Sequence, residues 1–196
     1  MSAGAGSAPI VGILLAGGSA SRFGSDKLLH PLAEGTPIAV ASARNLIAAV
    51  PRVVAVVRPG APDLERALRA AGAEVTVCDR AAEGMGVTLA HAVRAAGDAG
   101  GWVVALADMP FIRPETIRRV VAAVAGGAAI AAPEFRGERG HPVGFARRFR
   151  SALEQLAGDA GAREIVKADP AALARVAVDD PGVVRDIDTP ADLARG

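Results

Sequence analysis

A glycine-rich segment with two cations follows the first apolar run of the chain. The run is Ile10–Ala16, and residues 17–27 continue as Gly-Gly-Ser-Ala-Ser-Arg-Phe-Gly-Ser-Asp-Lys. Glycines let backbone N–H groups approach an anion closely, so this turn could cradle phosphates, with Ser19 as a further polar group and Arg22 and Lys27 neutralising the oxygens. The segment contains neither G-x-x-x-x-G-K-[ST] nor G-x-G-x-x-G, so it is neither a P-loop nor a dinucleotide fingerprint. A solvated Gly/Ser connection with two surface cations is the alternative.

A carboxylate stands at the end of another apolar run. Asp108 follows Trp102–Ala107 and precedes Met109-Pro110. Hard cations such as Mg²⁺ take oxygen ligands that they share with substrate phosphates. Asp108 is therefore a candidate Mg²⁺ ligand, and the alternative is an Asp that caps the turn before Pro110.

Two more carboxylates stand near the end of the chain, in Asp186-Ile187-Asp188-Thr189-Pro190. If the segment is extended, Asp186 and Asp188 point to one face and Ile187 to the other. Two carboxylates on one face repel each other unless a metal or a cation compensates them, so either could complete a site with Asp108. The alternative is that Asp188 caps a last helix together with Thr189. From the residues alone, His141 is more simply a structural histidine.

The elements that must position these residues follow an alternating pattern of strands and helices. Apolar runs predict strands at 10–16, 52–57, 73–77 and 102–107; amphipathic stretches and turn signals predict helices at 36–50 (with Thr36 as N-cap and Pro37 in the first turn), from 62 to Gly72, at 87–96, and from 113 to Gly126. Wholly apolar strands joined by helices indicate an α/β fold with a mostly parallel sheet covered on both faces. Ligands of such sheets bind beyond the carboxyl ends of the strands, here after Ala16, at Arg58, at Asp79 and at Asp108.

The second half of the chain does not continue the regular alternation of strands and helices. Residues 134–145 predict two short extended pieces around a turn, and helical stretches follow at 146–156 and 162–168. Further extended pieces are expected at 175–178 and 183–187, before a closing turn at Thr189-Pro190. We expect this half to add a small antiparallel part and a flap to the parallel sheet.

Composition excludes several classes of function. With 22 Lys+Arg against 21 Asp+Glu the formal charge is +1, and aromatic residues make up 3% of the chain, so neither a basic face nor a stacking platform for nucleic acid is expected. The single cysteine, Cys78, excludes an internal disulfide and a thiolate metal cage. Residues 1–9 are expected to form a flexible tail, residues 10–196 one domain, and no secretory or membrane-spanning segment is visible, which favours a cytoplasmic protein without a membrane partner.

Taken in order, these motifs resemble the MobA/MocA-like nucleotidyltransferases, which act on molybdenum cofactor. The resemblance covers nearly the whole chain: Leu15-Ala-Gly-Gly-x-x-x-Arg-x-Gly-x-x-Lys27, Gly84-Met-Gly-Val-Thr-Leu-Ala90, Asp108-Met-Pro110, Arg139-Gly-His-Pro-Val143, Gly158-Asp-x-Gly-Ala-Arg163 and Asp186-Ile-Asp-Thr-Pro-x-Asp-Leu193. The later motifs and Phe23 are similar to the cytidylyltransferase branch, whereas Ala-Gly-Gly at 16–18 is similar to the guanylyltransferase branch. Ala107 stands where a Gly is common in the family.

The resemblance implies a Rossmann-like GT-A fold and transfer of CMP or GMP from an NTP to a molybdopterin-type phosphate, with Mg²⁺ as cofactor and release of pyrophosphate. It also implies a molybdoenzyme or its chaperone as the partner that receives the product. Carried over by position, the residues that bind the nucleotide are Leu15, Ala16, Gly17, Gly18, Ser19, Arg22, Lys27, Asp79 and Asp108. Arg22, Lys27 and Asp108 would be catalytic, Asp108 with Asp188 (or Asp186) would hold the metal, and His141 would face the acceptor.

Two other functions stay open at this point. One is nucleotidyl transfer to another small phosphorylated acceptor, such as a sugar phosphate. The other is a protein that binds the nucleotide or cofactor and delivers it without catalysis; such a protein needs the cations but has little use for two metal carboxylates.

Overall fold

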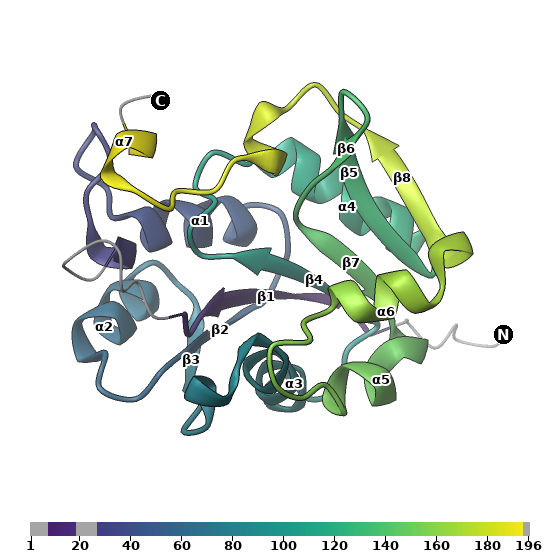
Figure 1. The fold of residues 1–196 in the computed structure, drawn as a ribbon, viewed down its shortest axis with the longest axis horizontal. Helices are drawn as coiled ribbons and strands as arrows, with labels where there is room; N and C mark the ends of the chain where they lie inside the picture. The colour runs from purple at the N-terminus through teal and green to yellow at the C-terminus, as the bar shows by residue number, and fades with distance from the viewer. Residues whose placement is uncertain (1–7, 19–26, 194–196) are drawn as a thin grey trace, which may run out of the picture.

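A mixed sheet of eight strands forms the centre of the computed structural model, which describes residues 8–18 and 27–193 (Figure 1). The order along the sheet is β3-β2-β1-β4-β7-β5-β6, and β8 pairs with β5. The strands are β1 Ile10–Ala16, β2 Val53–Val57, β3 Glu74–Val77, β4 Gly101–Leu106, β5 Ile130–Phe135, β6 Glu138–Arg139, β7 Val143–Ala146 and β8 Leu173–Ala177. The expected α/β class with a mostly parallel central sheet and a small antiparallel part is confirmed.

The first four strands are parallel, and the three inner ones, β1, β2 and β4, are largely buried. β1 lies between β2 and β4, with Leu15 opposite both Val56 and Leu106. Every residue of β2 is buried, as expected of a strand that is covered on both faces. The carboxyl ends of these strands lie at one edge of the sheet, where the loops with the candidate residues begin.

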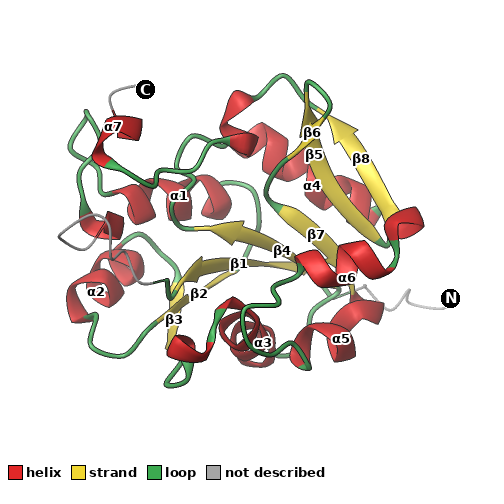
Figure 2. Ribbon diagram, in the orientation of Figure 1, coloured by secondary structure: helices red, strands yellow, loops and turns green. Residues whose placement is uncertain are grey.

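Helices cover both faces of this sheet (Figure 2). The longer ones are α1 Ile38–Ile47, α2 Pro62–Ala70, α3 Met85–Ala96 and α4 Pro114–Ala125, and the shorter ones are α5 Arg150–Glu154, α6 Arg163–Ala168 and α7 Pro190–Leu193. Helices α1, α2 and α4 contribute to one core layer, and α3, α5 and α6 to the other.

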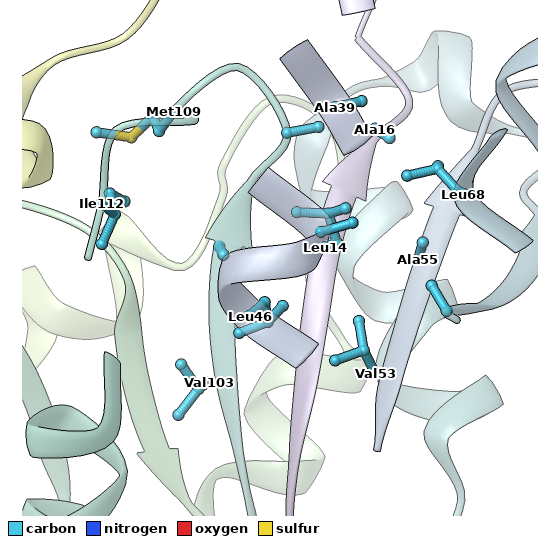
Figure 3. Packing of buried hydrophobic residues seen from close by; sticks show 14 of the residues in the cluster. Leu14, Ala16, Ala39, Leu46, Val53, Ala55, Leu68, Val103, Met109 and Ile112 are labelled. Carbon is cyan, nitrogen blue, oxygen red and sulfur yellow. The ribbon is translucent and has the colours of Figure 1, made fainter. Parts of the chain in front are cut away.

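Alternation along the strands divides the core between the two faces. Figure 3 shows Leu14 and Val103 of neighbouring strands packed with Leu46 of α1 on the first face. The next residues along these strands, Ile13 and Trp102 among them, belong to the second layer. Small aliphatic side chains fill both layers, and only the second layer contains the buried Trp102 and Phe145.

The antiparallel addition consists of fewer strands than expected. β7 runs antiparallel to β4 and to β5, but β8 runs parallel to β5, with Ile130 opposite Leu173. The reason lies in the connection: the chain leaves β7 at the end where β5 begins and passes through two short helices. It then starts β8 at that same end.

The prediction of an extended piece at 183–187 is wrong for its first two residues. Residues Pro181–Val184 form a 3₁₀ turn, and Arg185 to Asp188 pair with no strand. The side chain of Asp180 accepts a hydrogen bond from the N–H of Gly182, which starts the turn. A Cβ on Gly182 would lie 2.2 Å from the carbonyl oxygen of Phe111, so this turn packs directly against backbone.

Helix boundaries differ from the expectation at three places, one of which is that α1 ends at Ile47 rather than at residue 50. Thr36 does not cap α1; its carbonyl accepts from the N–H of Leu32 in a tight turn, and the helix begins after Pro37. Helix α3 begins at Met85 rather than at residue 87, because Gly84 adopts a φ of 123° that ends the preceding turn. Among the described residues, no helix has the length and apolar character needed to cross a bilayer.

Candidate functional site

A cavity of about 690 Å³ lies at the carboxyl ends of the four parallel strands. Each strand contributes residues from the loop that follows it: Gly17 and Gly18 after β1, Arg58 after β2, Asp79 after β3 and Asp108 after β4. This is the edge at which open α/β sheets bind ligands. The four loop positions expected from the sequence therefore surround one cavity.

Lys27 connects two segments that are far apart in the sequence. Its Nζ donates to Oδ2 of Asp108 at 2.9 Å and to Oδ1 of Asp188 at 3.3 Å. The Lys27 side chain is only 12% exposed. Burial by itself would lower the pKa of Lys27, but the hydrogen bonds and charges of the two aspartates outweigh it and the pKa is raised. The site thus holds a fixed ammonium between two carboxylates.

The backbone after the 3₁₀ turn brings Asp188 to this place. The N–H of Ile187 donates to the carbonyl oxygen of Asp108 at 3.0 Å, and the Ile187 side chain is fully buried. Asp186 and Asp188 therefore share the opposite side, as the alternation predicted, although the segment is not a strand. Partial desolvation, with the charges of Asp188 and Asp108, raises the pKa of Asp186.

Asp188 does not cap the last helix. The side chain of Asp192, inside that helix, reaches back instead: its Oδ2 accepts from the N–H groups of Asp188 and Thr189 and from the Thr189 hydroxyl. The carboxylate of Asp188 is thereby left for Lys27. Of the two candidate aspartates, Asp188 is the one with a hydrogen bond to the ammonium.

The carboxylates fit a divalent cation that substrate helps to hold. In the two described ranges, no group of three or more His, Cys, Asp or Glu side chains converges in a way that could hold a metal. Asp108 and Asp188 nevertheless contact one common cation, the Lys27 ammonium. Mg²⁺ is usually bound through one or two carboxylates together with substrate phosphates rather than by an all-protein cage. These residues match that arrangement.

A second, smaller cavity of about 340 Å³ adjoins the first. Leu15, Leu106, Met85 and Asp159 line both cavities, so the two are neighbours. His141 lines only the second one. Burial, followed by the positive charge of Arg139, lowers the pKa of His141.

Two glycine-bearing motifs form the wall between α3 and the later chain. The N–H of Gly86 donates to the carbonyl oxygen of Gly158 at 2.8 Å. A Cβ on Gly84 would lie 2.4 Å from that oxygen, and one on Gly86 would lie 2.8 Å from the carbonyl oxygen of Ala160. The close approach places Asp159 beside both cavities.

Most of the expected nucleotide-binding residues surround the larger cavity. Leu15, Gly17, Gly18, Lys27, Asp79 and Asp108 line it. Ala16 does not, because its side chain points into the core layer of α1 and α2. Ser19 and Arg22 lie outside the described residues.

Several lining residues had no role assigned from the sequence. Arg58 and Asp159 line the larger cavity, and Arg139 and Arg163 line the smaller one. Three of them, Arg139, Asp159 and Arg163, stand inside motifs that carry the family resemblance, so position within a motif was the available signal. Arg58 was expected at this edge from its place after the second strand, but without a role.

Comparison with known proteins decides the family. Residues 12–176 match the MobA-like NTP transferase domain. The chain belongs to this family. It is a nucleotidyltransferase domain that acts on a nucleoside triphosphate, which agrees with the cavity beyond the parallel strands. The molecule therefore belongs to a class of transferases whose members typically use a divalent metal.

Known relatives extend over different shares of the chain. The purine catabolism protein PucB of Bacillus subtilis is 30% identical over 192 residues, which cover 92% of each chain. The bifunctional protein GlmU of Dinoroseobacter shibae is 40% identical over 122 residues, or 59% of this chain. The chain spans only about a quarter to a third of the length of the GlmU proteins it matches (27% and 33%).

A solved structure from Mycobacterium tuberculosis has the same fold. Rv0371c superposes with a TM-score of 0.83 and 27% identity, covering 96% of this chain and 97% of its own. A structure of Rv0371c in complex with manganese superposes with a TM-score of 0.79 and 26% identity.

Proposed function

We propose that this protein transfers CMP or GMP from CTP or GTP to the phosphate of a molybdopterin-type acceptor and releases pyrophosphate, with Mg²⁺ as cofactor. The observation that carries the proposal is the contact of Lys27 with both Asp108 and Asp188 beside the larger cavity. It unites one cation and two hard oxygen ligands from three distant segments, as transfer between two anions requires.

The nucleoside triphosphate would occupy the larger cavity. Backbone groups of Leu15, Ala16, Gly17, Gly18 and Ser19 would surround its phosphates and base. Asp79 lines the same cavity after β3 and would contact the ribose or the base. Arg22 and Lys27 would neutralise the triphosphate oxygens.

Asp108 and Asp188 would hold the divalent cation. Mg²⁺, when bound, would neutralise phosphate charge at the reacting phosphorus. The manganese complex of Rv0371c supports a divalent cation in a protein of this fold. Held by these two carboxylates, the divalent cation would lie on the same side of the cavity as Lys27.

The reaction would be an in-line displacement. An oxygen of the acceptor phosphate forms a bond to the α-phosphorus, the bond from the α-phosphorus to the bridging oxygen of the β-phosphate breaks, and pyrophosphate leaves with that electron pair. Because both reactants are anions, the task of the protein is neutralisation and alignment. His141 would face the acceptor from the second cavity, and a molybdoenzyme or its chaperone would receive the product.

Pyrophosphate release tests the proposal. CTP and GTP are each supplied with Mg²⁺ and molybdopterin, and N-acetylglucosamine 1-phosphate replaces molybdopterin in a parallel series. We expect release with one nucleotide and molybdopterin, and its loss in Asp108→Asn. Release only with the sugar phosphate would refute the acceptor. If both nucleotides raise the melting temperature but neither reacts with any acceptor, a binding and delivery function replaces the enzymatic one.

A further inference from the structure

The second cavity has polar and apolar walls. Arg139, Arg163 and His141 line it with nitrogen groups, Asp159 and Glu164 line it with carboxylates, and Leu89, Val143 and Val166 supply apolar surface. Its walls come from strands β1, β4, β6 and β7 of the sheet and from α3 and the segment that includes α6, two helices that cover the same face of the sheet (Figure 1). A cavity of this composition suits a ligand with an anionic group and an apolar body.

Arg139 has no counter-ion in the described parts of the chain. Its side chain is partly buried, yet it makes no hydrogen bond or ion pair with any residue of ranges 8–18 and 27–193. Other arginines of this protein do pair with carboxylates, as in Arg52–Glu74 and Arg150–Glu154. A partly buried guanidinium without a carboxylate is costly unless an anion binds it, and its fork of donors matches phosphate oxygens.

The neighbours of Arg139 leave its charge available. His141 has a lowered pKa because it is buried and because Arg139 is positive, so the imidazole is neutral at neutral pH. Arg163 lines the same cavity, and its guanidinium is 3.7 Å from Glu164 in an exposed and loose ion pair. Two arginines therefore face this space.

The second cavity adjoins the first. Leu15 and Leu106 are opposite each other in the sheet and line both cavities. An anion on Arg139 would therefore lie in the space next to the larger cavity.

We propose that Arg139 binds the phosphate of the acceptor in the second cavity, with Arg163 beside it, and that the aliphatic wall packs against the ring system of the acceptor. This inference rests on the proposed function, because it assigns the second substrate of the same reaction. It makes Arg139 a substrate-binding residue and the aliphatic wall a selectivity element.

Calorimetric titration with small probes tests this assignment. The larger cavity is first filled with α,β-methylene-CTP or α,β-methylene-GTP and Mg²⁺, so that phosphate cannot bind there. The probes are phenyl phosphate, inorganic phosphate and phenol. We expect phenyl phosphate to bind most tightly and phenol not to bind, because both the anion and the apolar body contribute.

Variants then isolate the guanidinium. We expect Arg139→Gln to weaken phenyl phosphate binding by about tenfold or more, and Arg139→Lys to retain part of it. Arg119→Gln is the matched control, since Arg119 is exposed on α4 at the opposite face. An unchanged thermal midpoint shows that each variant is folded, and the affinity for the methylene analogue reports on the larger cavity separately.

Each remaining outcome counts against a named claim. Unchanged phenyl phosphate binding in Arg139→Gln, with normal analogue binding, would overturn the inference alone. Equal losses of analogue and phenyl phosphate would assign Arg139 to the nucleotide and also overturn it. Failure of both analogues to bind wild-type protein would refute the proposed function, and the inference with it.

Discussion

The position of Lys27 predicts that its ammonium competes with the divalent cation. Without nucleotide, the ammonium lies between Asp108 and Asp188, the two carboxylates that would bind the metal. Once a triphosphate is bound, Lys27 gains anionic partners and the carboxylates become free for the cation. Lys27→Met keeps most of the stem and removes the charge, so it should make the nucleotide-free site more receptive to metal and less able to bind the triphosphate.

The expected effects on metal binding and on turnover have opposite signs. Each of the two ion pairs with a partly exposed carboxylate contributes about 1 kcal/mol after solvent screening. Removing both should strengthen metal binding by about 2 kcal/mol, or roughly thirtyfold. Losing a preorganised cation at the transferring phosphate should cost about 2.7–4 kcal/mol, which lowers turnover about a hundredfold to a thousandfold.

The assay is Mn²⁺ binding followed by electron paramagnetic resonance, with turnover measured by pyrophosphate release. Lys167→Met is the matched control, because Lys167 is the only other lysine and pairs with Glu164 on α6. It should leave both quantities unchanged. Weaker or equal Mn²⁺ binding in nucleotide-free Lys27→Met would refute the competition, and near-normal turnover would remove Lys27 from the proposed catalytic role.

Three further predictions concern pH and packing. The pKa of His141 is lowered in the fold, so the unfolded chain takes up its proton first; stability should fall as pH drops below about 6.5, and urea titrations at several pH values should show a smaller fall in His141→Gln. Gly86→Ala would force a Cβ against backbone carbonyls and should lower the free energy of unfolding by about 1–3 kcal/mol, measured by urea denaturation. An unchanged urea midpoint would show that the backbone around Gly86 shifts at little cost and would contradict this prediction. Asp180 is buried and accepts a hydrogen bond from the Thr116 hydroxyl at 2.7 Å, so Asp180→Ala should lower the thermal midpoint of unfolding by several degrees. A change no larger than that of an exposed substitution such as Asp63→Ala would contradict this anchoring role.

The parallel half of the fold was predictable because its signals are local. Ile10–Ala16 and 102–107 are apolar without interruption, and glycine or proline marks most of the turns between elements. Strand ends of a parallel sheet meet at one edge, so the shared location of Asp79 and Asp108 followed from topology. The contact of Lys27 with Asp188 was not predicted, since spacing along the chain does not report such a contact and the family resemblance only assigned both residues to one site.

Other features depend on contacts that a pattern of residues does not contain. The turn at Pro181–Val184 forms because Asp180 is held by the N-terminal part of α4, about 65 residues earlier in the chain. The direction of β8 is set by where two short helices return the chain. The second cavity lies between strands, α3 and the segment that includes α6, which are distant in the sequence, so the place of Arg139 in it is visible only in the structure.

The location of the metal relative to the two carboxylates tests the account most directly. Crystals grown with Mn²⁺ and α,β-methylene-CTP or α,β-methylene-GTP would be measured at the manganese absorption edge. We expect an anomalous peak about 2.2 Å from oxygens of both Asp108 and Asp188 and beside the nucleotide phosphates, with the Lys27 ammonium moved onto the triphosphate. A peak remote from both carboxylates, or a Lys27 ammonium that still lies between them, would contradict it.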